Sequence, residues 1–319
     1  MAHLLETMAY LHETPWHGLG NQLSSGQPVE VWTQQAGMDW RICESPVHFM
    51  TDGANGPGVI ASYPENKVLF RSDTQVPLSV VSQRFQVVQP REILEFYRDL
   101  TEVSGFELET AGVLKGGRKI WALARTGQSS MLKGNDVSNA YVLLATACDG
   151  TLATTAQFTS IRVVCNNTLA VALGASNGAI KVRHNTAFDA QSVKRQLGIS
   201  VSTWNFFMYQ MKGLSERKVK THEAMNYLAR VFSDETKAGS DNASDRTMAK
   251  VMTLFDGHGR GAELASSKGT AFGLLNSVTQ FIDHDRRARS TDHRLESAWF
   301  GQGAALKARA LDQALMMIS

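Results

Sequence analysis

The sequence is poor in cysteine, and the positions of the few cysteines exclude two kinds of small scaffold. Of 319 residues only three are cysteine, namely Cys43, Cys148 and Cys165, and no two of them form a CxxC pair. An odd number of widely spaced cysteines supports neither a disulfide framework nor a thiolate zinc site. We therefore expect reduced thiols in a cytoplasmic protein.

Long apolar runs are missing as well. No run approaches the roughly 18 to 20 residues that a membrane helix needs, and the start MAHLLETMAYLHETPWHG lacks the basic and apolar regions of a signal peptide. The formal net charge is only +2, so the chain is no polycation and a nucleic-acid surface would depend on local clusters of cations. The sequence predicts a soluble protein that is not exported and has no membrane partner.

Motifs for nucleotide or nucleophilic chemistry are also absent. The segment GHGRG at 257–261 lacks the GxxxxGK[ST] order of a P-loop, and the sequence has no GxSxG elbow and no HExxH motif. Apolar or β-prone neighbours predict burial of Cys148 and Cys165, and neither has a histidine partner that can be placed. The sequence therefore identifies no catalytic residue and no cofactor, and it favours a protein that is not an enzyme.

What the sequence does contain is 43% hydrophobic residues, enough for one large domain or two ordinary ones. Residues 1–40 carry many glycines and prolines and predict an irregular arm. From residue 41 onward short β-prone runs recur, among them GVIASY, KVLFR, LSVVS and FQVV, divided by Asp52-Gly53, Pro64-Glu65-Asn66 and Gln83-Arg84. Residues 41–187 thus predict a β-rich α+β domain with a meander of short strands.

Two hairpins and a helix are the clearest elements of this domain. Gly116-Gly117 lies between FELETAGVL and KIWALART, and Asp149-Gly150 is favoured in a two-residue turn with positive φ at both central residues. Pro90 suits the first turn of a helix whose apolar residues keep helical spacing until Gly105. After Thr168 we expect a short helix, LAVALG, and a last strand, AIKVRH.

Past Phe188 the apolar spacing becomes helical, and we place a boundary near Ala187. Residues 188–319 predict a helical region with helices over 190–211, 216–232, 245–255, 270–283 and 304–317. The predicted fold class is α+β: an antiparallel, meander-like sheet with a packed helix, followed by a mostly helical C-terminal region.

The first candidate site is the Gly116-Gly117 hairpin, which is flanked by Lys115, Arg118 and Lys119. Strand alternation puts Trp121 on the face of Lys119, and cations beside an aromatic ring suit a phosphate backbone and an unstacked base. The alternative is a solvated hairpin tip whose lysines keep a sheet edge from aggregating.

A second candidate site is the polar cluster of Arg162, Asn166 and Asn167, which stands among apolar residues. Such side chains can recognise a phosphate or a base edge, but asparagine is also a leading helix N-cap, so one of the two amides has a structural alternative. Lys181, Arg183 and His184 would add positive potential, and we expect Arg162 and Arg183 to share a surface with Lys115 and Arg118.

The segment DHDRRARSTDHR, 283–294, combines two Asp-His pairs with arginines. Imidazole and carboxylate can bind divalent ions, but this spacing matches no metal motif and the neighbouring arginines would repel a cation. The open alternatives are an arginine-rich loop that touches nucleic acid or a neighbouring subunit, and a solvated loop with local ion pairs. The candidate nucleic-acid ligands here are Arg286, Arg287 and Arg289.

Several long runs resemble one family. They are PWHGLG near the start, SQRFQVVQPREI, GGRKIWALAR, the CDGT turn followed by IRVVCNNTL, and KGTAFGLLNSVTQFIDH with RLESAWFGQGAALK near the end. Together they are similar to the phage/plasmid-like proteins that carry domain of unknown function 932. Such proteins occur on prophages, phages and conjugative plasmids, some beside genes that handle single-stranded DNA. The resemblance implies DNA metabolism in a mobile element and supplies no catalytic residues.

Three functions are compatible with these features. The first is a single-stranded DNA-binding, strand-annealing protein of recombination that acts as a homo-oligomer. The second is a protein-interaction or counter-defence module of a mobile element. The third is a metal-dependent enzyme acting on nucleotides or nucleic acid, with Asp283, His284, Asp292 and His293 as ligands or acid-base groups. We expect the first, which predicts strong salt dependence of binding.

Overall fold

The computed structural model describes residues 5–11, 20–53, 56–164, 167–170, 179–197, 201–232 and 241–319. The chain forms two compact units. Unit 1 comprises residues 1–126, 142–157 and 180–197, and unit 2 comprises residues 127–141, 158–179 and 198–319. Three strands, at residues 119–132, 136–147 and 154–162, each contribute one stretch of residues to unit 1 and one to unit 2.

The larger sheet has the strand order β10-β9-β8-β7-β6-β1-β2, and β11 pairs with β9. β6 pairs antiparallel with β7 and with β1, β9 pairs antiparallel with β10, and β1 pairs parallel with β2. Antiparallel sheets followed by helices confirm the predicted α+β class. The strands are β1 (Leu5–Tyr10), β2 (Asn21–Gln22), β6 (Glu107–Leu114), β7 (Lys119–Leu132), β8 (Asp136–Ala147), β9 (Thr154–Arg162), β10 (Asn167–Ala170) and β11 (Ala179–Val182).

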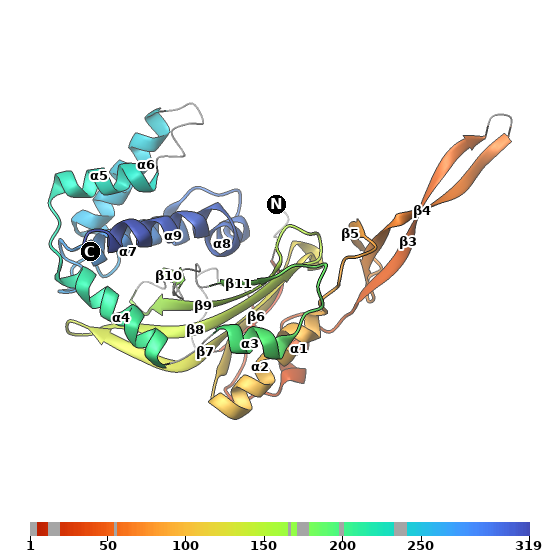
Figure 1. Ribbon diagram of the computed structural model, residues 1–319, viewed down its shortest axis with the longest axis horizontal. Helices are drawn as coiled ribbons and strands as arrows, with labels where there is room; N and C mark the ends of the chain where they lie inside the picture. The colour runs from red at the N-terminus through yellow and green to blue at the C-terminus, as the bar shows by residue number, and fades with distance from the viewer. Residues whose placement is uncertain are drawn as a thin grey trace. The chain divides into compact units, whose positions relative to one another are not determined.

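The predicted packed helix is α2 (Pro90–Ser104), which lies beside α1 (Val29–Gln35) in unit 1 (Figure 1). Ile93, Leu94 and Phe96 are at most 1% exposed and form its core face. Tyr97 on the same face donates from its hydroxyl to the carbonyls of Ala122 and Val142, at 2.9 and 3.0 Å. Burial raises the pKa of Tyr97 well above its ordinary value, so its phenol stays protonated.

A separate three-stranded sheet in unit 1 is built from β3 (Ile42–Gly53), β4 (Gly56–Arg71) and β5 (Pro77–Ser82). Figure 1 shows β3 and β4 as a long two-stranded ribbon that extends past β5. The predicted break at Pro64-Glu65-Asn66 is wrong, because β4 runs through it. The extra residues are absorbed by a register shift, in which Pro46 pairs with Lys67 and Val47 pairs with Tyr63.

Helices dominate the rest of the chain, as predicted. Unit 1 ends with α3 (Ala190–Leu197), and α7 is nearly all buried, which makes it the central helix of unit 2. No helix among the described residues is long and apolar enough to cross a membrane. The helices of unit 2 are α4 (Val201–Glu216), α5 (Thr221–Val231), α6 (Asp241–Thr253), α7 (Ala271–Gln280), α8 (Thr291–Phe300) and α9 (Gln302–Leu315), with π-helical turns η3 (Leu254–His258) and η4 (Phe281–Asp285).

Four sequence predictions need correction. The arm over 1–40 contains β1 and α1, since β1 gains a partner in β6 and α1 buries Trp32. FQVV, 85–88, is not a strand, and the predicted loop around 291–294 begins α8. Leu169 and Ala170 lie in β10, paired with β9, instead of in a helix, and residues 171–174 of LAVALG lie outside the described residues.

Both predicted hairpins exist, but the turn at Asp149-Gly150 is longer than the predicted two residues. Six residues, 148–153, separate β8 from β9, and Gly150 has a φ of 74°. Residues 54–55 between β3 and β4 lie outside the described residues, as do Pro15 to Leu19 of the PWHGLG run. The predicted helix over 190–211 forms as α3 and α4, with residues 198–200 outside the described residues.

Candidate functional site

The turn between β6 and β7 holds the first group of predicted nucleic-acid ligands. A 3-10 turn, η1 (Lys115–Gly117), bends the chain with positive φ at Lys115 and at both glycines. Gly117 lies against the ring of Trp40, where an added Cβ would come within 2.9 Å, so this position requires glycine. Arg118 is exposed and Lys115 is half-buried.

Two residues of this hairpin do not fit the predicted surface. Lys119 is 3% exposed and Trp121 is 1% exposed, and both lie in the part of β7 whose residues are buried one after another. Strand alternation predicts one solvated face, but both faces of β7 are covered here. Lys119 therefore leaves the candidate surface, and Trp121 is a core residue instead of a base-stacking ring.

Other loops of unit 1 meet this turn through specific contacts. The backbone N–H of Cys148 donates to the carbonyl of Arg118 at 2.9 Å, and the Ser79 hydroxyl donates to the carbonyl of Cys148 at 2.7 Å. His184 Nε2 donates to the carbonyl of Leu152 at 2.9 Å, which ties the end of β11 to the same β8–β9 turn. The ends of β5, β6, β8 and β11 are thus joined at one place in unit 1.

The loop before α2 joins this group through His184. Its ring stacks on that of Phe85, with centroids 4.3 Å apart, and the N–H of Gln86 donates to the His184 carbonyl at 2.5 Å. Arg84, Arg118 and Arg183 are exposed on these loops, and Lys181 is exposed in β11. We define the basic loop cluster as Arg84, Lys115, Arg118, Lys181 and Arg183.

Two acidic residues lie in or contact the same group of loops. Asp149 lies in the β8–β9 turn and accepts hydrogen bonds from the backbone N–H and the hydroxyl of Thr151, and Glu65 accepts from the N–H of Gln83 through its carbonyl. Burial, followed by the charge of Asp149, raises the pKa of the Cys148 thiol to about 12. Cys148 is therefore a neutral buried thiol beneath the cluster and not a nucleophile.

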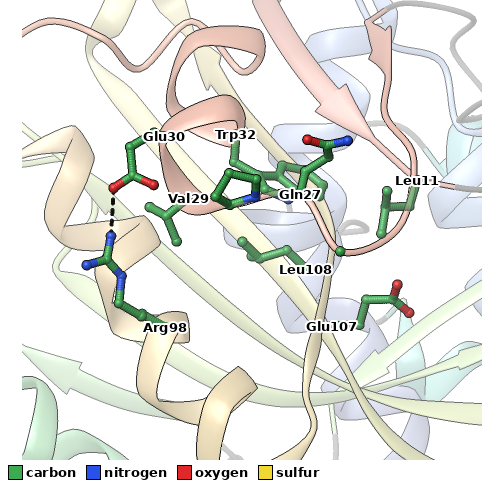
Figure 2. Close-up of a pocket in the computed structure, with 10 residues that line it drawn as sticks. Leu11, Gln27, Val29, Glu30, Trp32, Arg98, Glu107 and Leu108 are labelled. Carbon is green, nitrogen blue, oxygen red and sulfur yellow. Dashed lines mark hydrogen bonds and ion pairs between the residues drawn. The ribbon is translucent and has the colours of Figure 1, made fainter.

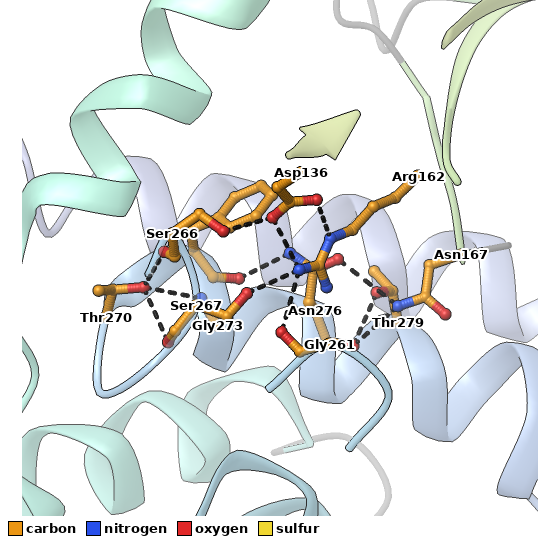
Figure 3. Close-up of polar contacts among 11 residues, drawn as sticks. Asp136, Arg162, Asn167, Gly261, Ser266, Ser267, Thr270, Gly273, Asn276 and Thr279 are labelled. Atoms are coloured by element: carbon orange, nitrogen blue, oxygen red, sulfur yellow. Dashed lines mark hydrogen bonds and ion pairs between the residues drawn. The ribbon is translucent and has the colours of Figure 1, made fainter. Parts of the chain in front are cut away.

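Arg162 lies in a wholly different environment, inside unit 2 (Figure 3). Its side chain is 4% exposed, and Nε and Nη2 donate to the two carboxylate oxygens of Asp136, each at 2.7 Å. Nη2 also donates to Ser267 Oγ at 2.8 Å and to the carbonyl of Gly261 at 3.2 Å. The Ser266 hydroxyl donates to Asp136, whose side chain is fully buried.

Local sequence explains how Gly261 can serve this cluster. Its φ is +68°, and an added Cβ would meet Val164 at 2.8 Å and Arg162 Nη2 at 3.1 Å. The Arg162 guanidinium also lies 5.2 Å from the centre of the Phe272 ring. These contacts satisfy the arginine inside the protein and correct the prediction that Arg162 lies on a surface with Arg183.

Asn167 is likewise a buried structural residue. It is 4% exposed in β10, and its Nδ2 donates to the carbonyl of Asn276 in α7 at 3.1 Å. The helix-cap alternative is also wrong for Asn167, because the residue pairs with Arg162 in a sheet. Asn166 lies outside the described residues.

A second buried ion pair occupies the predicted Asp-His segment. Lys307 Nζ lies 2.6 Å from Asp283 Oδ1, and both side chains are no more than 7% exposed. Asp283 Oδ2 accepts from the N–H of Thr168 at 2.8 Å, so this pair joins α9 and η4 to β10. The described residues contain no group of three His, Cys, Asp or Glu side chains that could hold a metal ion.

The arginines after Asp283 have mixed environments. Arg287 and Arg289 are exposed, whereas Arg286 is half-buried and donates to Gln302 Oε1 at 2.9 Å. His293 Nδ1 forms a hydrogen bond of 2.9 Å with Ser290 Oγ in the N-terminal cap of α8. The side chain of Asp292 lies outside the described part of the structure. Arg287 and Arg289 therefore remain candidates for a surface contact.

Unit 1 also contains a cavity of about 360 Å³ between α1, α2 and β6 (Figure 2). Trp32, Leu11 and Leu108 give it an apolar wall, and Glu30 with Arg98 forms an ion pair of 2.9 Å at its edge. The charges of this pair are already satisfied within the protein.

Sequence reasoning missed Arg84 and the partners of Arg162. Gln83-Arg84 stands between two β-prone runs, where the pair was interpreted only as a turn signal. A cation in a loop next to strand ends also indicates a binding surface, and this signal could have identified Arg84. Asp136 lies 26 residues before Arg162 and Ser267 lies 105 residues after it, so no local pattern marks them as partners.

Fold and site together define an α+β protein with a cluster of exposed cations on the loops of one unit and buried ion pairs in the other. The family described as Domain of unknown function (DUF932) matches residues 77–299, which is more than half of the chain. The chain therefore belongs to this family. No curated protein and no solved structure matches it.

Proposed function

We propose that the chain binds single-stranded DNA through the basic loop cluster, and that it acts as a homo-oligomer in DNA recombination or strand annealing in a phage or plasmid. The observation that supports this most is the meeting of Arg84, Arg118 and Arg183 on connected loops of unit 1. All the residues of the cluster fall within the segment that defines the family.

The chemistry of the cluster suits a phosphate backbone. Guanidinium groups bind phosphate through two parallel hydrogen bonds, and exposed arginines keep this capacity when no carboxylate occupies them. The half-buried His184 ring, stacked on Phe85, gives the cluster an aromatic edge where an unstacked base could rest. Unpaired bases offer such stacking faces, which favours single strands over duplexes.

The exposed pair Arg287 and Arg289 forms a second set of candidate phosphate ligands in unit 2. We propose that these arginines hold phosphates in their own right, as the arginine-rich composition of their segment predicts. Their contribution is separable, because neither residue takes part in the basic loop cluster.

The test is a fluorescence-anisotropy titration of the purified full chain. A labelled single strand of about 30 nucleotides offers room for several binding sites, and an identical duplex serves as the comparison. We expect binding of the single strand at about 50 mM salt that weakens strongly by about 200 mM. Absence of binding at the low salt concentration would overturn the proposal.

One observation favours the second candidate, a protein-interaction module of a mobile element. Phe49, Met50 and Ile60 are large apolar side chains exposed on the β3–β4 ribbon, and such side chains mark surfaces that other proteins cover. A pull-down with nuclease-treated protein would recover a stable partner in the absence of DNA if this candidate were correct.

A further inference from the structure

The β3–β4 ribbon has two unlike faces in its outer half. Here the register is regular, and Val47, Phe49 and Thr51 pair with Tyr63, Ala61 and Val59. Directly opposed residues point to the same side of a sheet, and successive residues alternate. One face, which we call the apolar face, therefore carries Val47, Phe49, Thr51, Val59, Ala61 and Tyr63. The other face carries the polar residues His48 and Ser62 together with two exposed apolar residues, Met50 at 75% and Ile60 at 68%.

The apolar face is in water in the single chain. Phe49 is 47% exposed, Val59 is 62% exposed and Tyr63 is 45% exposed. An isolated two-stranded hairpin is marginally stable in water, and this one extends beyond its third strand, since β5 pairs with β4 only at residues 66–70. Covering the face would stabilise the ribbon as well as remove apolar surface from water.

The charges around this face restrict what can cover it. No lysine or arginine is present among the described residues from 42 to 66, so the outer half of the ribbon offers no cationic side chain of these types to a phosphate. The apolar face itself carries no charged residue. An uncharged face can pack on an identical face without bringing like charges together.

We infer that the apolar face is a self-association surface, on which the ribbon of a second copy of this chain packs face to face. A contact related by a two-fold axis uses the same patch twice and closes on itself. Stacked sheets lie about 10 Å apart with interdigitated side chains, and small Ala61 beside Phe49 leaves room for a large side chain from the facing ribbon. This inference does not depend on DNA binding.

The area available limits the strength of such a contact. The exposed parts of these side chains amount to ~400 Å² per copy, or ~800 Å² for both, which is below the roughly 1,200 Å² of a stable interface, so the contact is expected to be weak and concentration-dependent. We expect a dimer whose dissociation constant is on the order of micromolar or weaker. The ribbon precedes residue 77, where the family match begins.

Two neighbouring residues provide a matched pair of variants. Ala61 lies on the apolar face and Ser62 lies on the opposite face of the same strand. Ala61→Asp and Ser62→Asp add the same charge to small side chains one residue apart. Sedimentation velocity of the full chain across a concentration series measures the dimer dissociation constant of each variant. We expect Ala61→Asp to raise it at least tenfold and Ser62→Asp to change it less than about twofold.

Either of two outcomes would overturn the inference. The first is a wild-type chain that stays at the 35.0 kDa monomer mass up to about 100 µM. The second is an equal effect of the two variants on the dimer dissociation constant. Co-sedimentation of a monomeric chain with neutral phosphatidylcholine vesicles, abolished by Ala61→Asp, would identify a membrane as the occupant instead. Circular dichroism checks that both variants are folded. The DNA titration is repeated with Ala61→Asp, so that a loss of self-association is measured separately from DNA binding.

Discussion

The arginines of the basic loop cluster and Arg162 have opposite roles in this protein. In unit 1, Arg84, Arg118 and Arg183 are exposed on connected loops. In unit 2, Arg162 is 4% exposed and donates two hydrogen bonds to a carboxylate that is fully buried. The difference teaches that an arginine is a candidate ligand for DNA only when the fold has not already supplied its anion.

The energetic consequence follows from desolvation. Removing one member of a buried ion pair leaves the other charge without water and without a partner, which destabilises strongly. Removing an exposed arginine leaves nothing buried and changes stability little. Variants would contradict this difference if the loss of an exposed arginine destabilised the protein more than the loss of a buried one.

The largest effect should come from Arg162→Ala. This change leaves Asp136 buried with Ser266 as its remaining donor, and we expect a loss of about 3 to 5 kcal/mol in the free energy of unfolding. Urea denaturation followed by circular dichroism measures the loss. The matched control is Arg118→Ala, which should stay within about 0.5 kcal/mol of wild type. Similar losses in the two variants would refute the division of roles.

A somewhat smaller loss is expected for Lys307→Met, which keeps most of the side-chain volume but removes the charge next to Asp283. We expect about 3 kcal/mol of destabilisation, because the hydrogen bonds from Thr168 still serve the carboxylate. The double variant Lys307→Met/Asp283→Asn should recover part of this loss, since no uncompensated charge remains. Strict additivity of the two single changes would show that the pair is not coupled.

An intermediate case is Asp73, which accepts from Nε and Nη2 of the buried Arg71 at 2.9 and 2.7 Å. Hydrogen bonding from Arg71 is the main cause that lowers the pKa of Asp73 from 3.8 to about 2. The ionised carboxylate stabilises the fold above about pH 4, and this contribution is lost as the pH falls through about 2.

The expected effect at Asp73 is small, below about 1 kcal/mol, since solvent screens a side chain that is 39% exposed. The difference in urea midpoint between wild type and Asp73→Asn should narrow between pH 5 and pH 2.5. A difference that does not change with pH over this range would show that the carboxylate's ionisation contributes nothing to stability.

Much of the fold was accessible from the sequence, because it rests on local signals. The helix from Pro90 depends on a proline and on apolar spacing, and the hairpin at Gly116-Gly117 depends on glycines that tolerate positive φ. The strand through Pro64 was missed because a proline ordinarily ends a strand, whereas here a register shift accommodates the irregular stretch beside it.

The candidate site was less accessible, because burial is a property of the whole fold. Arg162 and Arg183 look alike in sequence, and the difference between them is set by Asp136 and Ser267, which come from distant segments. Arg118 and Arg183 come together through contacts of Cys148 and His184 that no periodicity reveals. Residue type therefore predicted a basic surface but not which cations form it.

The central claim is that the exposed arginines of unit 1 hold the phosphates of single-stranded DNA, and the salt dependence of Arg118→Ala/Arg183→Ala tests it most directly. Each cation that neutralises a phosphate of a single strand contributes about 0.7 to the slope of log affinity against log salt. We predict that this double variant lowers the slope by about 1.4, whereas Arg246→Ala/Lys250→Ala, which removes two exposed cations from α6, leaves it unchanged. An unchanged slope for the first variant, or an equal decrease for both, would contradict the claim.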